Sequence, residues 1–413
     1  MGTRFLLIGY NFYPELTGLG KYSGEMIYWL AKNGYECTVI TTYPYYPYWK
    51  VQEPFTKSRF WYSTEKQNFS SGGSITIYRC PMYVPAQPSG MKRVLLDFSF
   101  LISSAIKLLQ LVANTRLDFI FVVAPSFQFG LLGVLYKKLR NAKFMYHIQD
   151  MQIEAARDLG LIKSEFFLHF LFKIEEHIFR CADIISSISP AMIKNIQNKA
   201  HKNILLFPNW TDTKMFYPIE NRSILKKEFG FAETDKVVLY SGAIGEKQGL
   251  EGILQAADYC RTNKDLKFVI CGSGPYKQKL EDLAKSLMLQ NLHFFPLQPF
   301  DKFNSFLNMA DVHLIIQKSD ASDFVMPSKL TTILAVGGLA LITANEDSSL
   351  YSLVHEHCIG LLVKAEDQQA LNEGILKAVS EDNHTITNNA RLYTEANLSM
   401  ENILETFINN VDL

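Results

Sequence analysis

Residues 240–251 read YSGAIGEKQGLE, a glycine-rich turn between the apolar run Val237–Tyr240 and the helical segment Glu251–Cys260. A strand that passes through such a turn into a helix is the repeating unit of a parallel α/β sheet. The glycines and Lys247 suit a diphosphate, because backbone N–H groups supply shape and the lysine supplies charge. The GxxxxGK[ST] pattern of a Walker loop is absent. A tight turn with a solvated lysine is the alternative interpretation.

The same alternation of apolar runs and helical patterns extends over the whole chain. The first runs are Phe5–Ile8, Thr38–Thr42, Ile75–Arg79, Phe119–Val123, Phe144–Ile148 and Ile184–Ile188. The pattern restarts with Ile204–Phe207, Val237–Tyr240, Phe268–Cys271, His293–Phe295, His313–Ile316, Ala340–Thr343 and Leu361–Val363. Strands that alternate with helices predict parallel sheets covered on both faces. We therefore expect an α/β protein with two Rossmann-like, doubly wound domains.

The join between the two domains is predicted in the turn-rich stretch between Pro208 and Pro218. This places the first domain at residues 1–207 and the second at 208–396, with a final helical segment at 397–413. Ligands of open parallel sheets bind outside the carboxyl ends of the strands. We expect the functional loops at those ends.

Composition excludes several classes of protein. The 413 residues carry 41 Lys+Arg and 41 Asp+Glu, so the net charge lacks the basic excess typical of nucleic-acid binding. The six cysteines form no CxxC pair, which argues against a zinc site and against a disulfide framework. The run Phe5–Ile8 is too short for a signal-peptide core. A cytoplasmic protein is expected.

One apolar segment, Val94–Ala113, suggests contact with a membrane surface. Asp97, Lys107 and Gln110 interrupt it, so a membrane-spanning helix is disfavoured. Lys92 and Arg93 precede it, and such a basic start fits an anionic membrane surface. A buried core helix is the favoured alternative.

Further loops follow other predicted strands. Two glycines, Gly18 and Gly20, open a helix after the first strand, and Gly272 and Gly274 follow the run Phe268–Cys271. The residues Asp323, Pro327, Ser328 and Lys329 precede another helix, and Ser328 as a cap with Lys329 as a surface charge is an equally weighted alternative. His147 and Asp150 lie at the end of a central strand, where they are placed for general acid/base work or sugar hydroxyl binding. A purely structural role of His147 is an equally weighted alternative.

Together these loops resemble the retaining glycosyltransferases of family 4, of the colanic-acid, capsule and O-antigen type. Six motifs in the same order carry the resemblance: Tyr13-Pro14-Glu15-x-x-Gly18-x-Gly20, Thr41-Thr42-Tyr43-Pro44, His147-Ile148-Gln149-Asp150, Pro208-Asn209-Trp210, Tyr240–Glu251 and Met326–Leu330. The resemblance covers nearly the whole chain. It implies the GT-B fold, with two Rossmann-like domains facing across a cleft and the helix Met400–Val411 returning to the first domain.

The resemblance also implies roles for residues. The first domain would bind the acceptor and the second a sugar nucleotide, with UDP favoured over GDP. The donor-binding residues would be Gly18, Gly20, Gly242, Gly245, Lys247, Gly272, Gly274, Asp323, Pro327, Ser328, Lys329 and Thr332. The catalytic residues would be Asp150, His147 and Lys247.

Two positions depart from the family pattern. Ala243 stands where many members have a phosphate-binding arginine, and Thr332 stands near the glutamate that binds ribose. Asp323 only approximates the first glutamate of that motif. The resemblance implies transfer without a divalent metal ion and without a cofactor. The spacing of Asp320-Ala321-Ser322-Asp323, which is not that of a DxD motif, is consistent with this expectation.

The acceptor is expected to be a glycan on polyprenyl diphosphate, at the inner face of the cytoplasmic membrane. The residues assigned to the acceptor or the membrane are Tyr46, Trp49, Lys92 and Arg93, since aromatic and basic groups together favour a membrane interface. A rigid loop whose rings stack on sugars is the competing interpretation. Two other functions stay open: a sugar-nucleotide epimerase of GT-B type, and a non-catalytic scaffold in a glycan assembly complex.

Overall fold

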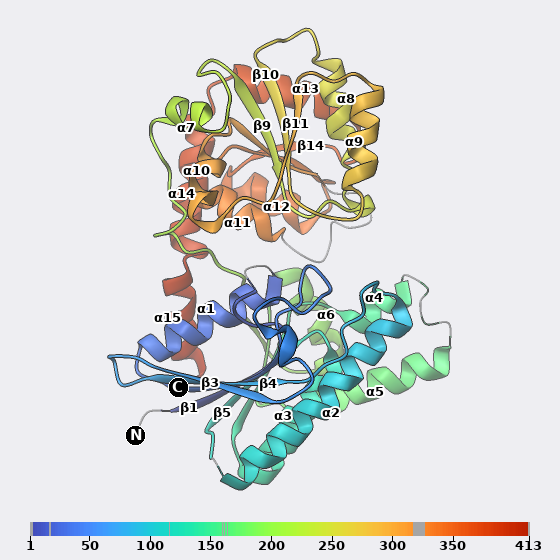
Figure 1. Ribbon diagram of the computed structural model, residues 1–413, viewed down its shortest axis with the longest axis vertical. Coiled ribbons are helices and arrows are strands. Elements are labelled where there is room, and N and C mark those ends of the chain that lie inside the picture. Colours follow the sequence, from blue (N-terminus) through green and yellow to red (C-terminus); the bar gives the residue numbers. More distant parts are fainter. Residues whose placement is uncertain are drawn as a thin grey trace. The chain divides into compact units, whose positions relative to one another are not determined.

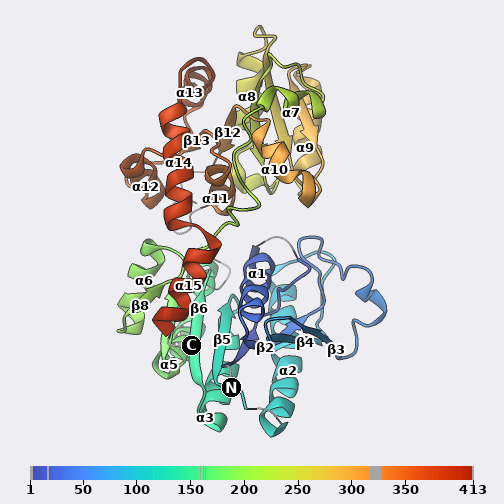
Figure 2. The same ribbon diagram turned by 90° about the vertical axis from the view of Figure 1, so that its left-hand side faces the viewer.

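The computed structural model describes residues 3–15, 18–114, 116–158, 160, 162, 164–316 and 327–411. Contacts divide the chain into two compact units: unit 1 is Met1–Pro208 with Thr406–Leu413, and unit 2 is Asn209–Glu405. Each unit is a parallel sheet with helices on both faces (Figures 1 and 2). The chain thus crosses from one unit to the other at residue 208 and again at residue 405.

Unit 1 contains an eight-stranded sheet in the order β3-β4-β2-β1-β5-β6-β7-β8, parallel except for the pair β3–β4. Its strands are β1 (Arg4–Ile8), β2 (Glu36–Thr42), β3 (Ser63–Asn68), β4 (Ser74–Cys80), β5 (Phe119–Ala124), β6 (Lys143–Ile148), β7 (Ile184–Ser187) and β8 (Ile204–Leu206). Its helices are α1 (Gly18–Lys32), η1 (Phe55–Lys57), α2 (Gly90–Asn114), η2 (Phe127–Phe129), α3 (Gly130–Arg140), α4 (Gln152–Asp158), α5 (Glu165–Cys181) and α6 (Pro190–Ala200).

Unit 2 contains a six-stranded parallel sheet in the order β11-β10-β9-β12-β13-β14. Its strands are β9 (Lys236–Ser241), β10 (Leu266–Cys271), β11 (Leu292–Phe295), β12 (Val312–Ile315), β13 (Ala340–Thr343) and β14 (Leu361–Val363). Its helices are α7 (Arg222–Glu228), η3 (Glu246–Gln248), α8 (Glu251–Tyr259), α9 (Lys277–Ser286), α10 (Phe300–Asn308), α11 (Ser328–Ala335), α12 (Ser349–His357), α13 (Gln368–Ser380) and α14 (His384–Asn397). The last helix, α15 (Met400–Val411), begins in unit 2 and ends in unit 1.

The central strands are apolar because both of their faces are covered. All six residues of β5 are buried, and alternate side chains pack on opposite faces of the sheet. On one face, Ile120 and Val122 join the core beneath α2, α3 and α5 (Figure 1). On the other face, Phe119 and Phe121 contact Phe407 of α15.

The topology places one switch point in each sheet. The chain leaves β1 toward β2 on one side and returns to β5 on the other, and β9 likewise lies between β10 and β12. Adjacent loops diverge at such a point and leave a crevice at the carboxyl ends of the strands. The loops after β1, β5, β9 and β12 are therefore the places to look for a binding site.

The predicted α/β class with two doubly wound parallel sheets is confirmed, with two differences in detail. The run at Ile204–Phe207 was grouped with the second set of strands, although the predicted boundary at residue 207 leaves it in the first domain; in the structure β8 pairs in parallel with β7 at the edge of the first sheet. Strand β3 was not expected, because its sequence STEKQN is polar and lacks an apolar signal. An exposed edge strand needs no buried face, so such a sequence suffices there.

Removal of the Phe407 ring should destabilise unit 1. Phe407 is buried and stacks on Phe207 with 4.6 Å between ring centroids. We expect Phe407→Ala to lower the free energy of unfolding by about 3–5 kcal/mol, as is usual for a buried phenylalanine. Urea unfolding followed by tryptophan fluorescence measures the change. The exposed neighbour Asn409 provides the control, and equal stability of Asn409→Ala and Phe407→Ala would contradict the packing role of α15.

Candidate sugar-nucleotide site

The two glycine loops of unit 2 are joined to each other through their backbones. The N–H of Gly242 donates to the carbonyl of Cys271 at 3.0 Å, and the N–H of Ile244 donates to that of Ser273 at 3.0 Å. The N–H of Tyr276 then returns a hydrogen bond to the carbonyl of Ile244 at 3.3 Å. These bonds extend the pairing of β9 with β10 beyond the sheet, so the loops form one platform at the carboxyl edge.

Gly272 and Gly274 are required by this contact between the loops. A Cβ atom at Gly272 would lie 1.9 Å from the carbonyl oxygen of Gly242, and one at Gly274 would lie 2.0 Å from that of Ile244. Both distances are far below a van der Waals contact. The sequence predicted these glycines as places where a ligand approaches the backbone; in the structure the neighbouring loop approaches it.

Lys329 lies beside this platform. Its ammonium is 4.0 Å from the centroid of the Tyr240 ring, and its Cδ would lie 3.7 Å from a Cβ atom at Gly242. The hydroxyl of Tyr240 donates to the carbonyl of Ala243 at 2.8 Å, which fixes the ring under the ammonium. This cation–π contact joins the start of α11 to the end of β9.

The surroundings of Lys329 favour an anionic ligand. Desolvation lowers the pKa of the Lys329 ammonium to about 7. Among the described residues, no carboxylate pairs with it. A cation that has lost much of its hydration and lacks a counter-charge is stabilised by an incoming anion. The position next to Gly242, at the switch point of the sheet, fits a phosphate group of a ligand.

The start of α11 adds further donors at the same place. Ser328 is exposed, Pro327 precedes the helix, and no side chain of the described residues caps the first N–H groups of α11. The hydroxyl of Thr332 donates back to the carbonyl of Lys329 at 3.0 Å. Free N–H groups at a helix N-terminus bind anions, which supports the same interpretation.

Two of the predicted donor-binding residues are described in part or not at all. The backbone of Lys247 lies in η3, but its side chain lies outside the described residues, as does the whole of Asp323. The neighbouring Gly245 is in tight contact with Gln248, whose Oε1 would lie 2.7 Å from a Cβ atom there.

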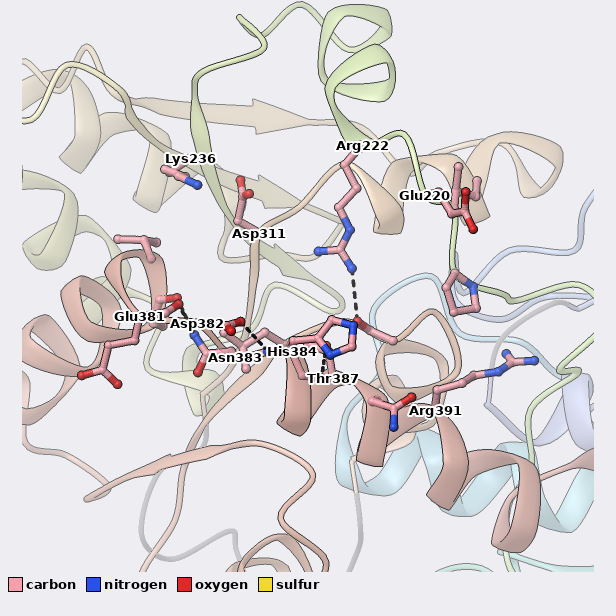
Figure 3. A pocket seen from close by; sticks show the side chains of 17 residues that line it. Glu220, Arg222, Lys236, Asp311, Glu381, Asp382, Asn383, His384, Thr387 and Arg391 are labelled. Carbon is pink, nitrogen blue, oxygen red and sulfur yellow. Dashed lines mark hydrogen bonds between the residues drawn. The ribbon is translucent and has the colours of Figure 1, made fainter.

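A hollow of unit 2 lies at the opposite edge of the sheet. It has a volume of about 590 Å³, and Figure 3 shows Arg222, Lys236, Asp311 and His384 around it. Lys236 begins β9 and Asp311 immediately precedes β12, so this hollow is at the amino ends of the strands. It is therefore separate from the platform of glycine loops.

In unit 1, the buried carboxylate of Glu15 joins the loops after β1 and β2. Its Oε1 accepts hydrogen bonds from the N–H groups of Tyr45 and Tyr46 at 2.7 and 2.8 Å, and its Oε2 accepts one from Asn11 Nδ2 at 2.7 Å. Burial raises the pKa of Glu15, and these hydrogen bonds oppose the increase. A Cβ atom at Gly20 would lie 2.6 Å from the Cβ of Glu15. Gly20 thus lets α1 start against this carboxylate.

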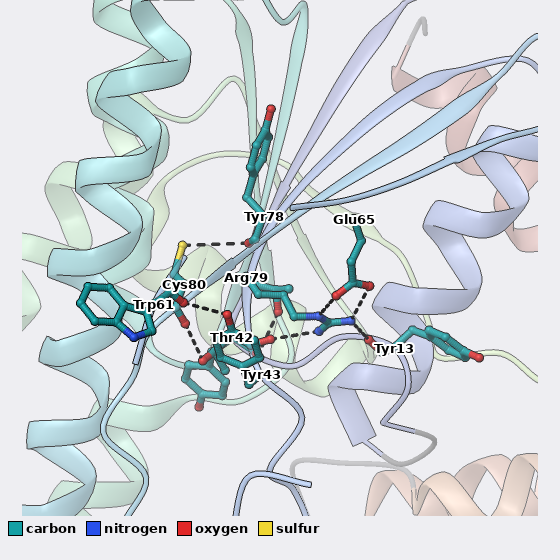
Figure 4. Close-up of polar contacts among 10 residues, drawn as sticks. Tyr13, Thr42, Tyr43, Trp61, Glu65, Tyr78, Arg79 and Cys80 are labelled. Atoms are coloured by element: carbon teal, nitrogen blue, oxygen red, sulfur yellow. Dashed lines mark hydrogen bonds and ion pairs between the residues drawn. The ribbon is translucent and has the colours of Figure 1, made fainter. Parts of the chain in front are cut away.

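Arg79 binds the loop after β1 and the end of β2 (Figure 4). Its side chain is 1% exposed, and it pairs with Glu65 of β3. It also donates to the carbonyls of Thr42 at 3.1 Å and Tyr13 at 3.0 Å. An arginine buried to this degree needs such partners, and they fix the loops at the carboxyl edge.

The aromatic loop after β2 is anchored by these contacts. Tyr46 is exposed, and its Cε1 would lie 4.0 Å from a Cβ atom at Gly18, which begins α1 with a φ of 56°. Trp49 meets the Tyr46 ring edge-on, and the Arg93 guanidinium lies 5.3 Å from the centroid of its ring. Lys92 is exposed beside Arg93. The structure therefore brings together Tyr46, Trp49 and Arg93, three of the residues predicted for the acceptor or the membrane, and Lys92 is the sequence neighbour of Arg93.

Helix α2 combines a buried face with an exposed apolar face. The exposed apolar residues are Met91, Val94, Leu95, Phe98, Ile102, Ile106 and Leu109. Among the described residues, α2 is the one helix long and apolar enough to cross a membrane, and 39% of its most apolar stretch is buried in unit 1. The two sequence interpretations, a core helix and a surface helix, thus each describe one face.

His147 lies next to the last residue of β6, as the sequence predicted, but its side chain is buried. Its side chain is 2% exposed and packs between Phe121 and Phe207, with Nδ1 2.8 Å from Ser186 Oγ. Burial lowers its pKa to about 3. Strand alternation turns it toward α15 rather than toward the edge of the sheet, so its contacts are those of a core residue.

Asp150 does lie at the carboxyl edge, two residues after the end of β6, and its side chain is exposed. Partial desolvation by neighbouring protein atoms raises the pKa of the Asp150 carboxyl, and the nearby negative charge of Glu154 adds to this increase. It therefore keeps its predicted place for contact with a hydroxyl group. In the described part of the chain, no group of three or more His, Cys, Asp or Glu side chains is placed to hold a metal ion.

The sequence did not predict roles for Tyr240, Glu15 and Arg79. Tyr240 and Arg79 lie at the ends of predicted strands, and Glu15 lies within the loop that follows the first strand. An aromatic residue directly before a glycine loop and a charged residue within an apolar run are the signals that could have identified them.

Two Rossmann-like units with ligand loops at their carboxyl edges define the GT-B architecture. Residues 17–210 match the family model described as glycosyl transferase 4-like domain, and residues 221–393 match the model described as glycosyl transferases group 1. The chain belongs to glycosyltransferase family 4.

One relative supports this family assignment, and two solved structures share the fold. The chain is 40% identical over 417 residues to WcaI of Escherichia coli (strain K12), whose name assigns it provisionally to colanic acid biosynthesis as a glycosyl transferase, and the match covers 99% of each protein. Sucrose-phosphate synthase of Thermosynechococcus elongatus has a similar structure, with a TM-score of 0.75 at 16% identity over 99% of this chain and 98% of that one. HepE of Anabaena, in complex with UDP and glucose, gives a TM-score of 0.70 at 13% identity over 99% of each chain.

The unusual environment of Lys329 can be measured directly. An ordinary lysine amine has a pKa of about 10.4, so at pH 8 Lys329 should already be neutral and nucleophilic. We expect its acetylation rate to rise through pH 7 and level off near pH 8. Mass spectrometry of the labelled peptides measures this, with the exposed Lys377 as the reference. Parallel pH profiles for the two lysines would contradict the desolvated site.

Proposed function

We propose that the protein transfers a sugar from a nucleoside-diphosphate donor to a glycan acceptor, with retention of the anomeric configuration. The observation that carries the proposal is the desolvated ammonium of Lys329, which lies over the Tyr240 ring beside the glycine loops at the switch point of unit 2 and pairs with no carboxylate of the described residues. Such a cation, together with the start of α11, suits the diphosphate of a sugar nucleotide. UDP is the favoured nucleotide, in keeping with the UDP and glucose of the HepE complex.

The diphosphate is the leaving group of the proposed reaction. As the bond between the sugar C1 and the phosphate oxygen breaks, Lys329, Lys247 and the N–H groups of α11 neutralise the developing charge. The acceptor hydroxyl attacks C1 from the same face, and its proton passes to the departing phosphate oxygen. This scheme requires no protein nucleophile and no metal ion. Asp150 orients a hydroxyl of donor or acceptor at the edge of unit 1.

The proposed acceptor is a glycan on a lipid diphosphate, in the assembly of a bacterial surface polysaccharide such as colanic acid. The name of WcaI supports the type of polysaccharide. The exposed apolar face of α2 supports a lipid-linked acceptor, because it would rest on an anionic bilayer with Lys92 and Arg93 beside the lipid phosphates. Asp97 is the one acidic residue of α2 and is buried, so the exposed face presents no negative charge. We propose a peripheral position on the cytoplasmic face of the membrane.

Calorimetric titration with UDP and GDP tests the donor site. We expect one nucleoside diphosphate to bind, and Lys329→Met to weaken it about 10- to 100-fold, because a charge-assisted contact to phosphate is lost. The exposed Lys377→Met is the matched control, and Lys247→Ala tests the second predicted lysine. Absence of nucleotide binding, or equal affinity of Lys329→Met and wild type, would contradict the assignment of Lys329 to the donor site.

Measurement of enzymatic turnover then distinguishes sugar transfer from epimerisation and from binding without catalysis. Release of nucleoside diphosphate only when an acceptor is added supports transfer, and NMR of the product reports the anomeric configuration. Interconversion of sugar nucleotides without an acceptor would indicate an epimerase. Binding without turnover across an acceptor panel would indicate a scaffold. Loss of activity in EDTA would contradict the metal-free scheme.

Flotation with lipid vesicles tests the membrane contact. Ile102 is 61% exposed in the middle of the apolar face of α2. We expect Ile102→Glu to bind anionic phosphatidylglycerol vesicles at least about tenfold more weakly than wild type. Leu392→Glu, an equally drastic change at an exposed leucine of unit 2, should bind as wild type does. Equal binding by all three proteins would exclude α2 as the contact surface.

A further inference from the structure

Helix α2 carries one ionisable residue on its buried face. Asp97 is 6% exposed, and the other buried residues of the helix are apolar or serine. They are Leu96, Phe100, Ser103, Ser104, Leu108 and Leu111. A carboxylate in such a place costs free energy that a leucine would not. Packing of the helix therefore does not explain why an aspartate stands there.

The contacts of Asp97 reach the loops at the carboxyl edge of unit 1. Its Oδ2 accepts a hydrogen bond from Gln152 Nε2 at 3.3 Å, and the same nitrogen lies 3.4 Å from Ser126 Oγ. The Oε1 of Gln152 accepts from the N–H of Phe127 at 3.3 Å. The polar network thus joins α2 to the loop after β5 and to the first residue of α4.

This network lies at the switch point of the first sheet. Ser126 follows β5, and Tyr10 follows β1, where the sheet order reverses. Burial and the nearby charge of Asp97 raise the pKa of Tyr10, and a hydrogen bond with Ser126 lowers it, so these three groups face one another. The loops after β1, β5 and β6 therefore meet around Asp97.

Gln152 is two residues after Asp150, the exposed carboxylate at the same edge. The side chain of Gln152 uses both its donor and its acceptor in this network. We propose that Asp97 is a positioning residue, which acts through Gln152 to hold the segment of Asp150 in place for the acceptor. The part of this inference that concerns the acceptor rests on the proposed function.

Hydrogen–deuterium exchange tests the positioning without any substrate. In Asp97→Leu, we expect amides of residues 149–157 to exchange about tenfold faster, the factor given by loss of a hydrogen bond to a charged group. Asp97→Asn keeps an oxygen acceptor for Gln152 and should restore near-native exchange. Ser104→Ala is the control for general damage to α2, because the Ser104 hydroxyl bonds within the helix. Unchanged exchange in Asp97→Leu, or faster exchange over all of unit 1, would overturn the proposal.

A second readout compares transfer to the acceptor with hydrolysis of the donor. This ratio does not depend on the fraction of folded protein, so a merely structural role leaves it unchanged. We expect it to fall about tenfold in Asp97→Leu and to recover in Asp97→Asn, while nucleotide affinity stays that of wild type. An unchanged ratio would refute the acceptor role of Asp97. A wild-type protein that binds no nucleotide would refute the proposed function instead, and the exchange experiment would still decide whether Asp97 holds the segment.

Discussion

Each sheet is covered by helices on both faces, and this burial confines exposed polar chemistry to the ends of the strands. The strands of each sheet run parallel, with β3 as the exception, so the loops that leave their carboxyl ends gather at one edge. Charged side chains that are buried near these edges need hydrogen-bonding or ionic partners. Arg79 has Glu65 and two carbonyls, Glu15 has three N–H groups, and Lys329 has the face of Tyr240. The first two are satisfied within the protein, whereas Lys329 has no carboxylate partner among the described residues, which is why we propose it as a phosphate-binding group.

The sequence predicted the parallel sheets because buried strands are continuous apolar runs, which are visible without any neighbour. It also located the glycine loops, since glycine after a strand is a strong local signal. Strand β3 escaped because an edge strand is stabilised by pairing with β4 and carries no apolar pattern of its own. Apolar runs and glycines in the sequence thus predict buried strands and the turns that follow them, but not an edge strand that depends on pairing.

Other features depend on contacts between distant segments and could not be read from spacing. The sequence shows that His147 lies near the end of a strand. Which face of the sheet its side chain occupies depends on the alternation of side chains along β6, and that alternation directs it toward Phe207, which stacks on Phe407 of α15. Gly274 is a glycine because Ile244 lies against it, thirty residues earlier in the chain. The low pKa of Lys329 comes from desolvation by its neighbours. Each is a property of the assembled fold rather than of a motif.

Because the end of helix α15 belongs to unit 1, this unit can complete its fold only after unit 2 has been synthesised. Unit 1 consists of residues up to Pro208 and the last residues from Thr406 onward, so its aromatic core around Phe121 and Phe207 lacks Phe407 until the end of the chain arrives. Because chains emerge from the ribosome N-terminus first, nearly two hundred residues of unit 2 are synthesised while that core is open. The first unit to be translated is therefore the last to be finished, and nascent chains would display an aromatic surface of the kind that chaperones retain.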